Sequence, residues 1–188
     1  MDILEKIIAN KRKEVALQKE ASPLNSFKYP HFERPPCSMR EALARSSSGI
    51  IAEFKRKSPL KGWLFPEAKV EDIVPAYETG GAAACSVLTD LEFFGGAFDD
   101  LSRARELVNI PLLRKDFMVD EYQIYQARAM GADAILLIAA VLTPAECLQF
   151  AQKAHELGMD VLLEIHCEDE LRCLNQHIDM LGVNNRNL

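Results

Sequence analysis

The sequence predicts an α/β fold in which helices cover a parallel sheet, because short apolar runs alternate with amphipathic segments from Gly49 onward. The apolar runs are almost uninterrupted, which is typical of strands that are buried on both faces. They occupy residues 49–55, 82–89, 111–117, 134–141, 160–166 and 179–185. The amphipathic segments between them predict helices over residues 70–81, 97–109, 120–132, 143–159 and 167–177.

The polar residues at the strand ends decide between an open, doubly wound sheet and a barrel. A dinucleotide-binding sheet carries a glycine-rich turn after its first strand, whereas RKSPLKGW follows the first strand here. In a barrel, by contrast, the carboxyl ends of all strands converge on one mouth, where catalytic groups meet. The sequence therefore predicts a TIM-type (β/α)8 barrel, of which about six strands are present. The polar residues at the strand ends are Glu53, Lys55, Lys115, Glu164 and Asn184.

The first part of the chain differs from the rest and is predicted to form an N-terminal helical extension over residues 1–48. Apolar residues at helical spacing predict a helix over residues 2–20, and a proline-rich stretch follows it. A short helix is expected over residues 38–45, with Ser38 as its N-cap. Residues 49–188 then form a single barrel domain.

Helix boundaries within the barrel segment carry start and stop signals. Thr143 and Pro144 provide an N-cap and a proline in the first turn of a helix. Gly131 and Gly158 stand where two helices are expected to end, since glycine readily adopts the left-handed conformation there.

The composition points to an ordinary cytoplasmic protein. The chain has 188 residues, 48% of them hydrophobic, and a formal net charge of -6. An acidic chain is a poor general partner for nucleic acid, and no apolar run is long enough to span a bilayer. Five cysteines without a CxxC pair are expected to be reduced thiols, mostly packed in the interior.

Ionisable residues near the strand ends are the candidate catalytic groups. Glu53 and Lys55 share one face of the first strand, either as a structural ion pair or as groups that contact a ligand. Lys115 is either a solvated lysine or, beside Asp116, an acid with a tuned pKa. Glu164 lies inside the apolar run VLLEI, where a carboxylate is costly unless it is paired or used. We therefore expect a functional role for Glu164.

Two further segments carry features that could contact a ligand. In GVNNRNL, Asn184 either caps a turn or binds a ligand, and the planar fork of Arg186 suits a carboxylate or phosphate. The loop FFGGAF, residues 93–98, is either simple loop packing or an aromatic wall beside a planar ligand. No histidine is assigned a role, and no spacing of Cys and His predicts a metal site.

The motifs together resemble one enzyme family. IIAEFKRKSPLKG, SVLTD with FFGG, LLRKDFMVDEYQIYQARAMGADAILLI, LLEIH and GVNNRNL resemble, in order, the strand signatures of indole-3-glycerol phosphate synthases. The N-terminal ILEKIIANKRKEV is similar to the extra helix that precedes the barrel in this family. The resemblance implies a lyase of tryptophan biosynthesis, which acts on a phosphosugar that carries an anthranilate ring. It implies no metal or organic cofactor.

The resemblance also implies roles for individual residues. Lys115 matches the general-acid lysine, and Glu164 matches the glutamate that transfers a proton during dehydration. Glu53 matches another catalytic glutamate, Lys55 a lysine that orients the substrate, and Asn184 a hydrogen-bonding amide. The other matches are Ser58 and Arg186 near the substrate carboxylate, and Pro59, Phe94, Phe117, Leu136 and Leu188 in an apolar slot around the aromatic ring.

The sequence departs from the family at its carboxyl end. The family's phosphate site follows strands seven and eight, and a catalytic serine comes from strand seven, but the sequence stops at Leu188. We therefore expect a shortened synthase with little activity of its own, which self-associates through open barrel edges. Two alternatives stay open: another phosphosugar barrel such as phosphoribosylanthranilate isomerase, and a non-catalytic barrel fragment that acts as an assembly or binding module.

Overall fold

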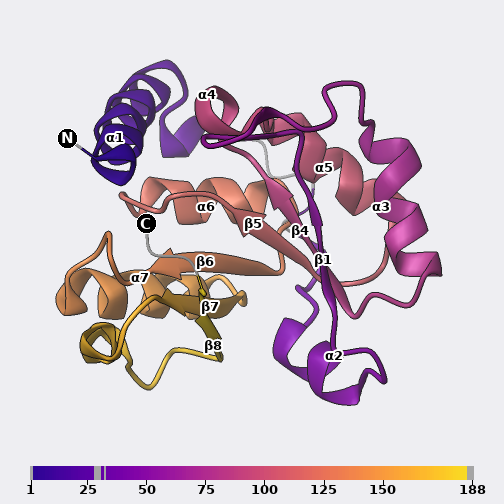
Figure 1. The fold of residues 1–188 in the computed structure, drawn as a ribbon. Coiled ribbons are helices and arrows are strands. Elements are labelled where there is room, and N and C mark those ends of the chain that lie inside the picture. Colours follow the sequence, from indigo (N-terminus) through magenta and orange to yellow (C-terminus); the bar gives the residue numbers. More distant parts are fainter. Residues whose placement is uncertain (1, 28–30, 32, 186–188) are drawn as a thin grey trace.

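The computed structural model describes residues 2–27, 31 and 33–185. Its centre is a curved sheet of six parallel strands, in which each strand pairs with the next one along the chain (Figure 1). This arrangement is that of an incomplete TIM-type barrel, as the sequence predicts. The strands are, in sheet order, β1 (Ile51–Phe54), β4 (Ala84–Leu88), β5 (Leu112–Lys115), β6 (Ala134–Ile138), β7 (Asp160–Ile165) and β8 (Met180–Val183).

The strand register brings the candidate residues to the same end of the sheet. Leu88, the last residue of β4, pairs with Lys115, the last residue of β5. Glu164 near the end of β7 pairs with Ile138 of β6 on one side and with Gly182 of β8 on the other. Because parallel strands all end on the same edge, the charged side chains gather at the carboxyl end of the barrel.

Four helices cover the outer face of the sheet, and their apolar faces form the main core with the strands. They are α3 (Val70–Thr79), α5 (Phe98–Leu107), α6 (Tyr122–Ala129) and α7 (Pro144–Glu156). Figure 1 shows α3 and α5 side by side, and the two helices are in contact. Thr143 caps α7 in a capping box with Glu146, as its position before Pro144 predicts.

Three short elements lie in the segments after β1 and β4, and the sequence patterns do not predict them. β2 (Lys57–Ser58) and β3 (Gly62–Trp63) form a small antiparallel pair after β1. The short helix α4 (Leu91–Phe94) lies within the expected loop after β4. Strands of two residues and a helix of one turn are too short to produce a recognisable hydrophobic period.

The predicted helix over residues 167–177 is wrong in type. The chain forms the 3₁₀ helix η2 (Glu168–Cys173) there, with no side-chain hydrogen bond at its N-cap. A segment of six residues does not complete two α-helical turns, and 3₁₀ geometry is common in such short connectors. The Glu170 side chain accepts a hydrogen bond from the backbone N–H of His166, which ties η2 to the end of β7.

The N-terminal segment supplies α1 (Ile3–Ala21), the 3₁₀ helix η1 (Leu24–Ser26) and α2 (Met39–Arg45). Ser38 caps α2, as the sequence predicts. Met39 is fully buried and packs among the small residues Ala84 and Ala134 in a second core cluster. In the described parts of the chain, no helix has both the length and the apolar character that a membrane crossing requires. The division of the chain at residues 48 and 49 stays a prediction.

Candidate active site

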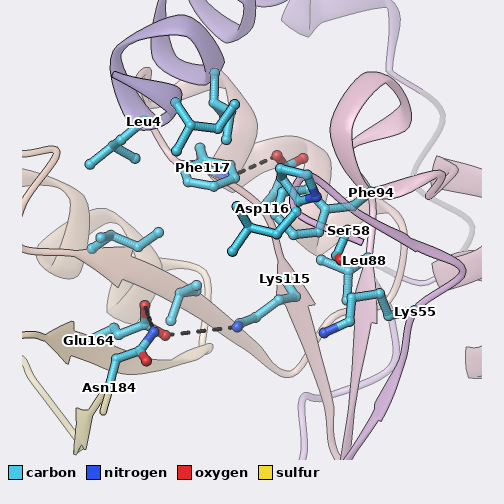
Figure 2. Close-up of a pocket in the computed structure, with 16 residues that line it drawn as sticks. Leu4, Lys55, Ser58, Leu88, Phe94, Lys115, Asp116, Phe117, Glu164 and Asn184 are labelled. Atoms are coloured by element: carbon cyan, nitrogen blue, oxygen red, sulfur yellow. Dashed lines mark hydrogen bonds and ion pairs between the residues drawn. The ribbon is translucent and has the colours of Figure 1, made fainter. Parts of the chain in front are cut away.

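A cavity of about 340 Å³ opens at the carboxyl end of the strands, a size typical of small-molecule sites. Strand ends provide its charged wall, the loop after β1 provides a second wall, and α1 provides a third (Figure 2). The lining residues that the sequence singled out are Lys55, Ser58, Pro59, Phe94, Lys115, Phe117, Leu136, Glu164 and Asn184.

Lys115 lies at the centre of the charged wall. Its Nζ atom is 3.6 Å from Oε2 of Glu53 and 3.8 Å from Oε2 of Glu164. On the far side of Glu53, the Nζ atom of Lys55 donates a hydrogen bond of 2.6 Å to Oε1. Two lysines and two glutamates from three strands thus form one continuous chain of ion pairs, and Figure 2 shows Lys115 directed toward Glu164.

The pKa of Glu53 reflects this pairing. Burial alone would raise the pKa of its carboxyl group, but Lys115 and Lys55 outweigh burial and hold the pKa below its ordinary value. Glu53 is therefore ionised at neutral pH. A fixed negative charge between the two ammonium groups keeps both lysines directed into the mouth of the barrel.

Glu164 is held from more than one side. The Asn184 side chain donates a hydrogen bond of 3.1 Å from Nδ2 to Oε1 of Glu164. Nε2 of His166 lies 3.6 Å from the same oxygen. Only 16% of the Glu164 side chain is exposed, so its interactions with neighbouring charges are weakly screened by solvent. The amide and the lysine fix the orientation of this carboxylate relative to the cavity.

The opposite side of the cavity is apolar. The rings of Phe94 and Phe117 lie with their centroids 5.9 Å apart and tilted by 40°. Leu136 of β6 and Pro59 of the loop after β1 complete the part of the slot that the sequence predicts. Such an apolar surface favours contact with a flat aromatic ring, because apolar and edge-to-face contacts are both favourable there.

Helix α1 contributes residues that the sequence reasoning missed. Ile3, Leu4 and Ile7 line the cavity, although α1 lies far from the strand ends in the sequence. One helical turn after Ile7, the Lys11 side chain is completely buried. The spacing Ile3, Ile7, Lys11, Val15 is the signal that could have revealed it, because it places a lysine on the apolar face of an amphipathic helix.

Lys11 joins α1 to the two loops that border the site. Its Nζ atom lies 2.9 Å from Asp90, 3.0 Å from Asp116 and 2.9 Å from Glu14 of its own helix. Asp90 precedes the helix that carries Phe94, and Asp116 lies between Lys115 and Phe117. Burial alone would lower the pKa of Lys11, but the carboxylates, Asp116 first, raise it above its ordinary value.

Asp116 is also held from the side of the barrel wall. Its Oδ2 atom accepts hydrogen bonds from Thr89, at 2.6 Å, and from the buried guanidinium of Arg114, at 3.1 Å. Its Oδ1 atom accepts from the backbone N–H of Phe117. Burial alone would raise the pKa of Asp116, but Arg114 and Lys11 hold it below its ordinary value. The residues on either side of Asp116 in the sequence, Lys115 and Phe117, are therefore anchored at a charged, buried point.

The structure brings most of the predicted site residues to this cavity. Glu53 does not line the cavity itself but contacts both lysines that do. The predictions for Arg186 and Leu188 lie outside the described residues. Within the loop FFGGAF, Phe94 is the aromatic residue that lines the described cavity. The expected aromatic wall consists of this residue and Phe117.

Comparison with known proteins assigns the chain to a family. The family model described as indole-3-glycerol phosphate synthase matches residues 4–188. The chain belongs to the indole-3-glycerol phosphate synthase family. This result confirms the family that the strand signatures predict.

Curated members of the indole-3-glycerol phosphate synthase family align with the whole chain. The synthase of Bacteroides thetaiotaomicron is 57% identical over 188 residues, which are 100% of this chain and 72% of that protein. The synthase of Neisseria meningitidis serogroup B is 49% identical, with 100% of this chain and 74% of that protein covered. The synthase of Laribacter hongkongensis is 48% identical, with 100% and 73% covered.

Proposed function

We propose that this chain provides the catalytic groups for the reaction of its family. That reaction closes a ring in 1-(2-carboxyphenylamino)-1-deoxyribulose 5-phosphate and forms indole-3-glycerol phosphate with loss of carbon dioxide and water. The observation that carries the proposal is the position of Lys115, whose Nζ atom lies between Glu53 and Glu164 beside an apolar cavity. An acid, two carboxylates and an aromatic slot are the groups that this chemistry needs in one place.

Lys115 is the proposed general acid of the ring closure. As the aromatic carbon attacks the sugar carbonyl, the carbonyl oxygen gains negative charge and needs a proton. The Lys115 ammonium can donate that proton, and its contacts with the carboxylates of Glu53 and Glu164 hold it at the cavity wall before the transfer. Carbon dioxide then leaves from the same ring carbon, so the aromatic system is restored without loss of a ring proton.

Glu164 is the proposed proton-transfer group of the dehydration. In this stage a hydroxyl group leaves as water, and the ring carbon beside the nitrogen loses a proton. The hydrogen bond from Asn184 holds the Glu164 carboxylate in a fixed orientation at the cavity wall. A carboxylate that is fixed in this way is close to the ring once the substrate occupies the slot.

The remaining predicted residues are proposed to bind the substrate. The aromatic ring packs against Phe94, Phe117 and Leu136, and Pro59 closes the slot. Lys55 and Ser58, which line the cavity on the side of the loop after β1, provide a cation and a hydroxyl for the substrate carboxylate. Arg186 and Leu188 stay proposed ligands of the carboxylate and the ring on the basis of the sequence motif.

The proposal is tested by steady-state turnover of the carboxyphenylamino substrate, followed by indole fluorescence. Lys115→Met keeps the length of the side chain but cannot donate a proton, so turnover should fall by about 10²- to 10⁴-fold. Lys69→Met is the matched control, because Lys69 is exposed and does not line the cavity. Unchanged turnover in Lys115→Met would refute the role of Lys115. A folded wild-type chain that shows no turnover, even after a segment with the family's strands seven and eight is added, would favour the non-catalytic module.

We also propose that the chain acts in the cytoplasm and without nucleic acid. The support is its net charge of -6 and sequence pI of about 5.3, which disfavour binding to a polyphosphate backbone. Retention of the chain on immobilised DNA or RNA at physiological salt would contradict the second statement. Fractionation of the producing cell tests the first.

A further inference from the structure

His166 is a buried imidazole that the proposed chemistry does not use. It directly follows β7, and it lies two positions after Glu164, on the same side of the strand. Its side chain is only 7% exposed. Nε2 is buried and has no hydrogen-bond partner among the described residues. An unsatisfied buried polar atom is costly, so its position calls for a physical reason.

The two ring nitrogens of His166 face two different carboxylates. Nε2 lies 3.6 Å from Oε1 of Glu164, which lines the cavity. Nδ1 lies 3.4 Å from Oε2 of Glu170 on η2, and the Glu170 side chain is 13% exposed. The backbone N–H of His166 donates a hydrogen bond of 2.8 Å to the same Glu170 oxygen. The ring is thus held between a carboxylate of the site and one outside it.

The hydrogen bonds that the ring can make depend on how many of its nitrogens carry hydrogen. In a neutral imidazole only one ring nitrogen carries a hydrogen. The other nitrogen would direct its lone pair toward the carboxylate oxygen that it faces, and two acceptors repel each other. Only the imidazolium form directs an N–H toward both Glu164 and Glu170. In the described part of the chain, the Lys115 ammonium and the Asn184 amide also contact Glu164, from β5 and from the end of β8.

We propose that His166 is a positioning residue for Glu164, and that its imidazolium ring, anchored by Glu170, orients the Glu164 carboxylate for proton transfer. This inference rests on the proposed role of Glu164. Lys115 must be free to give its proton away during ring closure, and its ion pair with Glu164 weakens when it does. A second cation on Glu164 that takes no part in that step keeps the carboxylate in place for the dehydration that follows.

The first experiment needs no turnover. The wild-type chain is labelled with ¹⁵N, and the ring N–H groups of His166 are observed by NMR near neutral pH. Two slowly exchanging ring N–H signals are expected, and the Nε2–H signal should shift or disappear in Glu164→Gln. Glu170→Gln keeps an oxygen that can accept from the backbone of His166 but removes the charge, so it should affect the Nδ1–H signal. A single ring N–H, or a spectrum that neither variant changes, would overturn the proposal.

The second experiment measures kcat and KM by steady-state turnover. His166→Asn should lower kcat by roughly tenfold or more and change KM by less than about twofold, since a small misplacement of a catalytic group is costly. His166→Lys should restore part of kcat. His177→Asn is the control, because His177 contacts His155 and does not line the cavity.

These outcomes separate the two proposals. If the wild-type chain has no turnover, even after a segment with the family's strands seven and eight is added, the proposed function fails, and the NMR result alone decides whether His166 holds Glu164. If turnover is present but His166→Asn keeps the wild-type kcat, the positioning role fails while the proposed function stands. Thermal unfolding of each variant is measured in parallel, and a kcat loss in Glu170→Gln at unchanged stability supports the positioning role.

Discussion

The buried ion pairs of Lys11 allow a quantitative prediction about how α1 is attached to the barrel. Lys11→Met keeps most of the apolar stem of the side chain and removes only the charged group. The Lys11 side chain is 0% exposed, and the side chains of Asp90 and Asp116 are 1% and 0% exposed. The substitution therefore leaves two carboxylates buried without their common cation.

The size of the effect follows from what each carboxylate retains. Asp116 keeps its contacts with Arg114 and Thr89, whereas Asp90 keeps one hydrogen bond, of 2.8 Å, from the backbone N–H of Phe93. Removal of one partner from a buried ion pair costs about 3–5 kcal/mol. For a chain of this length that loss lowers Tm by roughly 6–20 °C.

The assay is chemical denaturation at pH 7, with the free energy of unfolding obtained by linear extrapolation. Lys13→Met is the matched control, because Lys13 lies on the same helix but is exposed, so its effect should stay within about 0.5 kcal/mol. Addition of Asp90→Asn to Lys11→Met should recover part of the loss, because it removes the less satisfied of the two charges. A loss below about 1 kcal/mol in Lys11→Met would refute the view that these ion pairs attach α1.

The same contacts fix the sign of the pH dependence. The pKa of Lys11 is raised on folding, so its contribution is complete below its ordinary value of about 10.4 and is lost as the pH rises through the folded value. The pKa of Asp116 is lowered, so its contribution is complete above about 3.9 and is lost as the pH falls through the folded value. The stability difference between wild type and Lys11→Met should be constant around neutrality and shrink in acid.

Two further predictions concern the loop after β4 and the edge of the sheet. Gly95→Ala should cost more stability than Gly49→Ala. Both glycines have positive φ, +64° and +61°, but a Cβ at Gly95 would lie 2.7 Å from the Trp63 ring, and one at Gly49 meets nothing within 4 Å. We also propose that the chain self-associates through the edge strand β8, where Val183 is 75% exposed. Val183→Lys should reduce self-association measured by sedimentation velocity. Leu17→Lys on α1 is the control and should leave self-association unchanged. Equal losses of stability in the two glycine variants would contradict the first prediction. Equal effects of the two lysine variants on self-association would contradict the second.

The sequence predicts the sheet and its covering helices because both depend on local hydrophobic patterns. All six strands and the helices α3, α5, α6 and α7 lie where apolar runs and amphipathic periods indicate. The grouping of Lys55, Lys115 and Glu164 also follows from the sequence, since parallel strands place their carboxyl ends together. Rules of this kind need only the order of the elements along the chain.

The features that the sequence does not predict depend on contacts between distant segments. The position of Lys11 within an apolar stripe indicates burial, but only the folded chain shows that Asp90 and Asp116 are its partners. The contact of His166 with Glu170 likewise depends on η2, where the sequence predicts a helix of a different type. Local periodicity carries no information about which buried charges meet.

The position of α1 connects its stability with the electrostatics of the site. Ile3, Leu4 and Ile7 form an apolar wall of the cavity, so displacement of α1 would admit water beside Lys115 and Glu164. Water raises the local dielectric constant, and the attraction between charges 3.8 Å apart falls in proportion. Lys11 lies one turn after Ile7 and two turns after Ile3 on the same helix, and its ion pairs hold that wall in place. A variant that weakens them should therefore weaken the pairing of Lys115 with Glu164, even though Lys11 itself does not line the cavity.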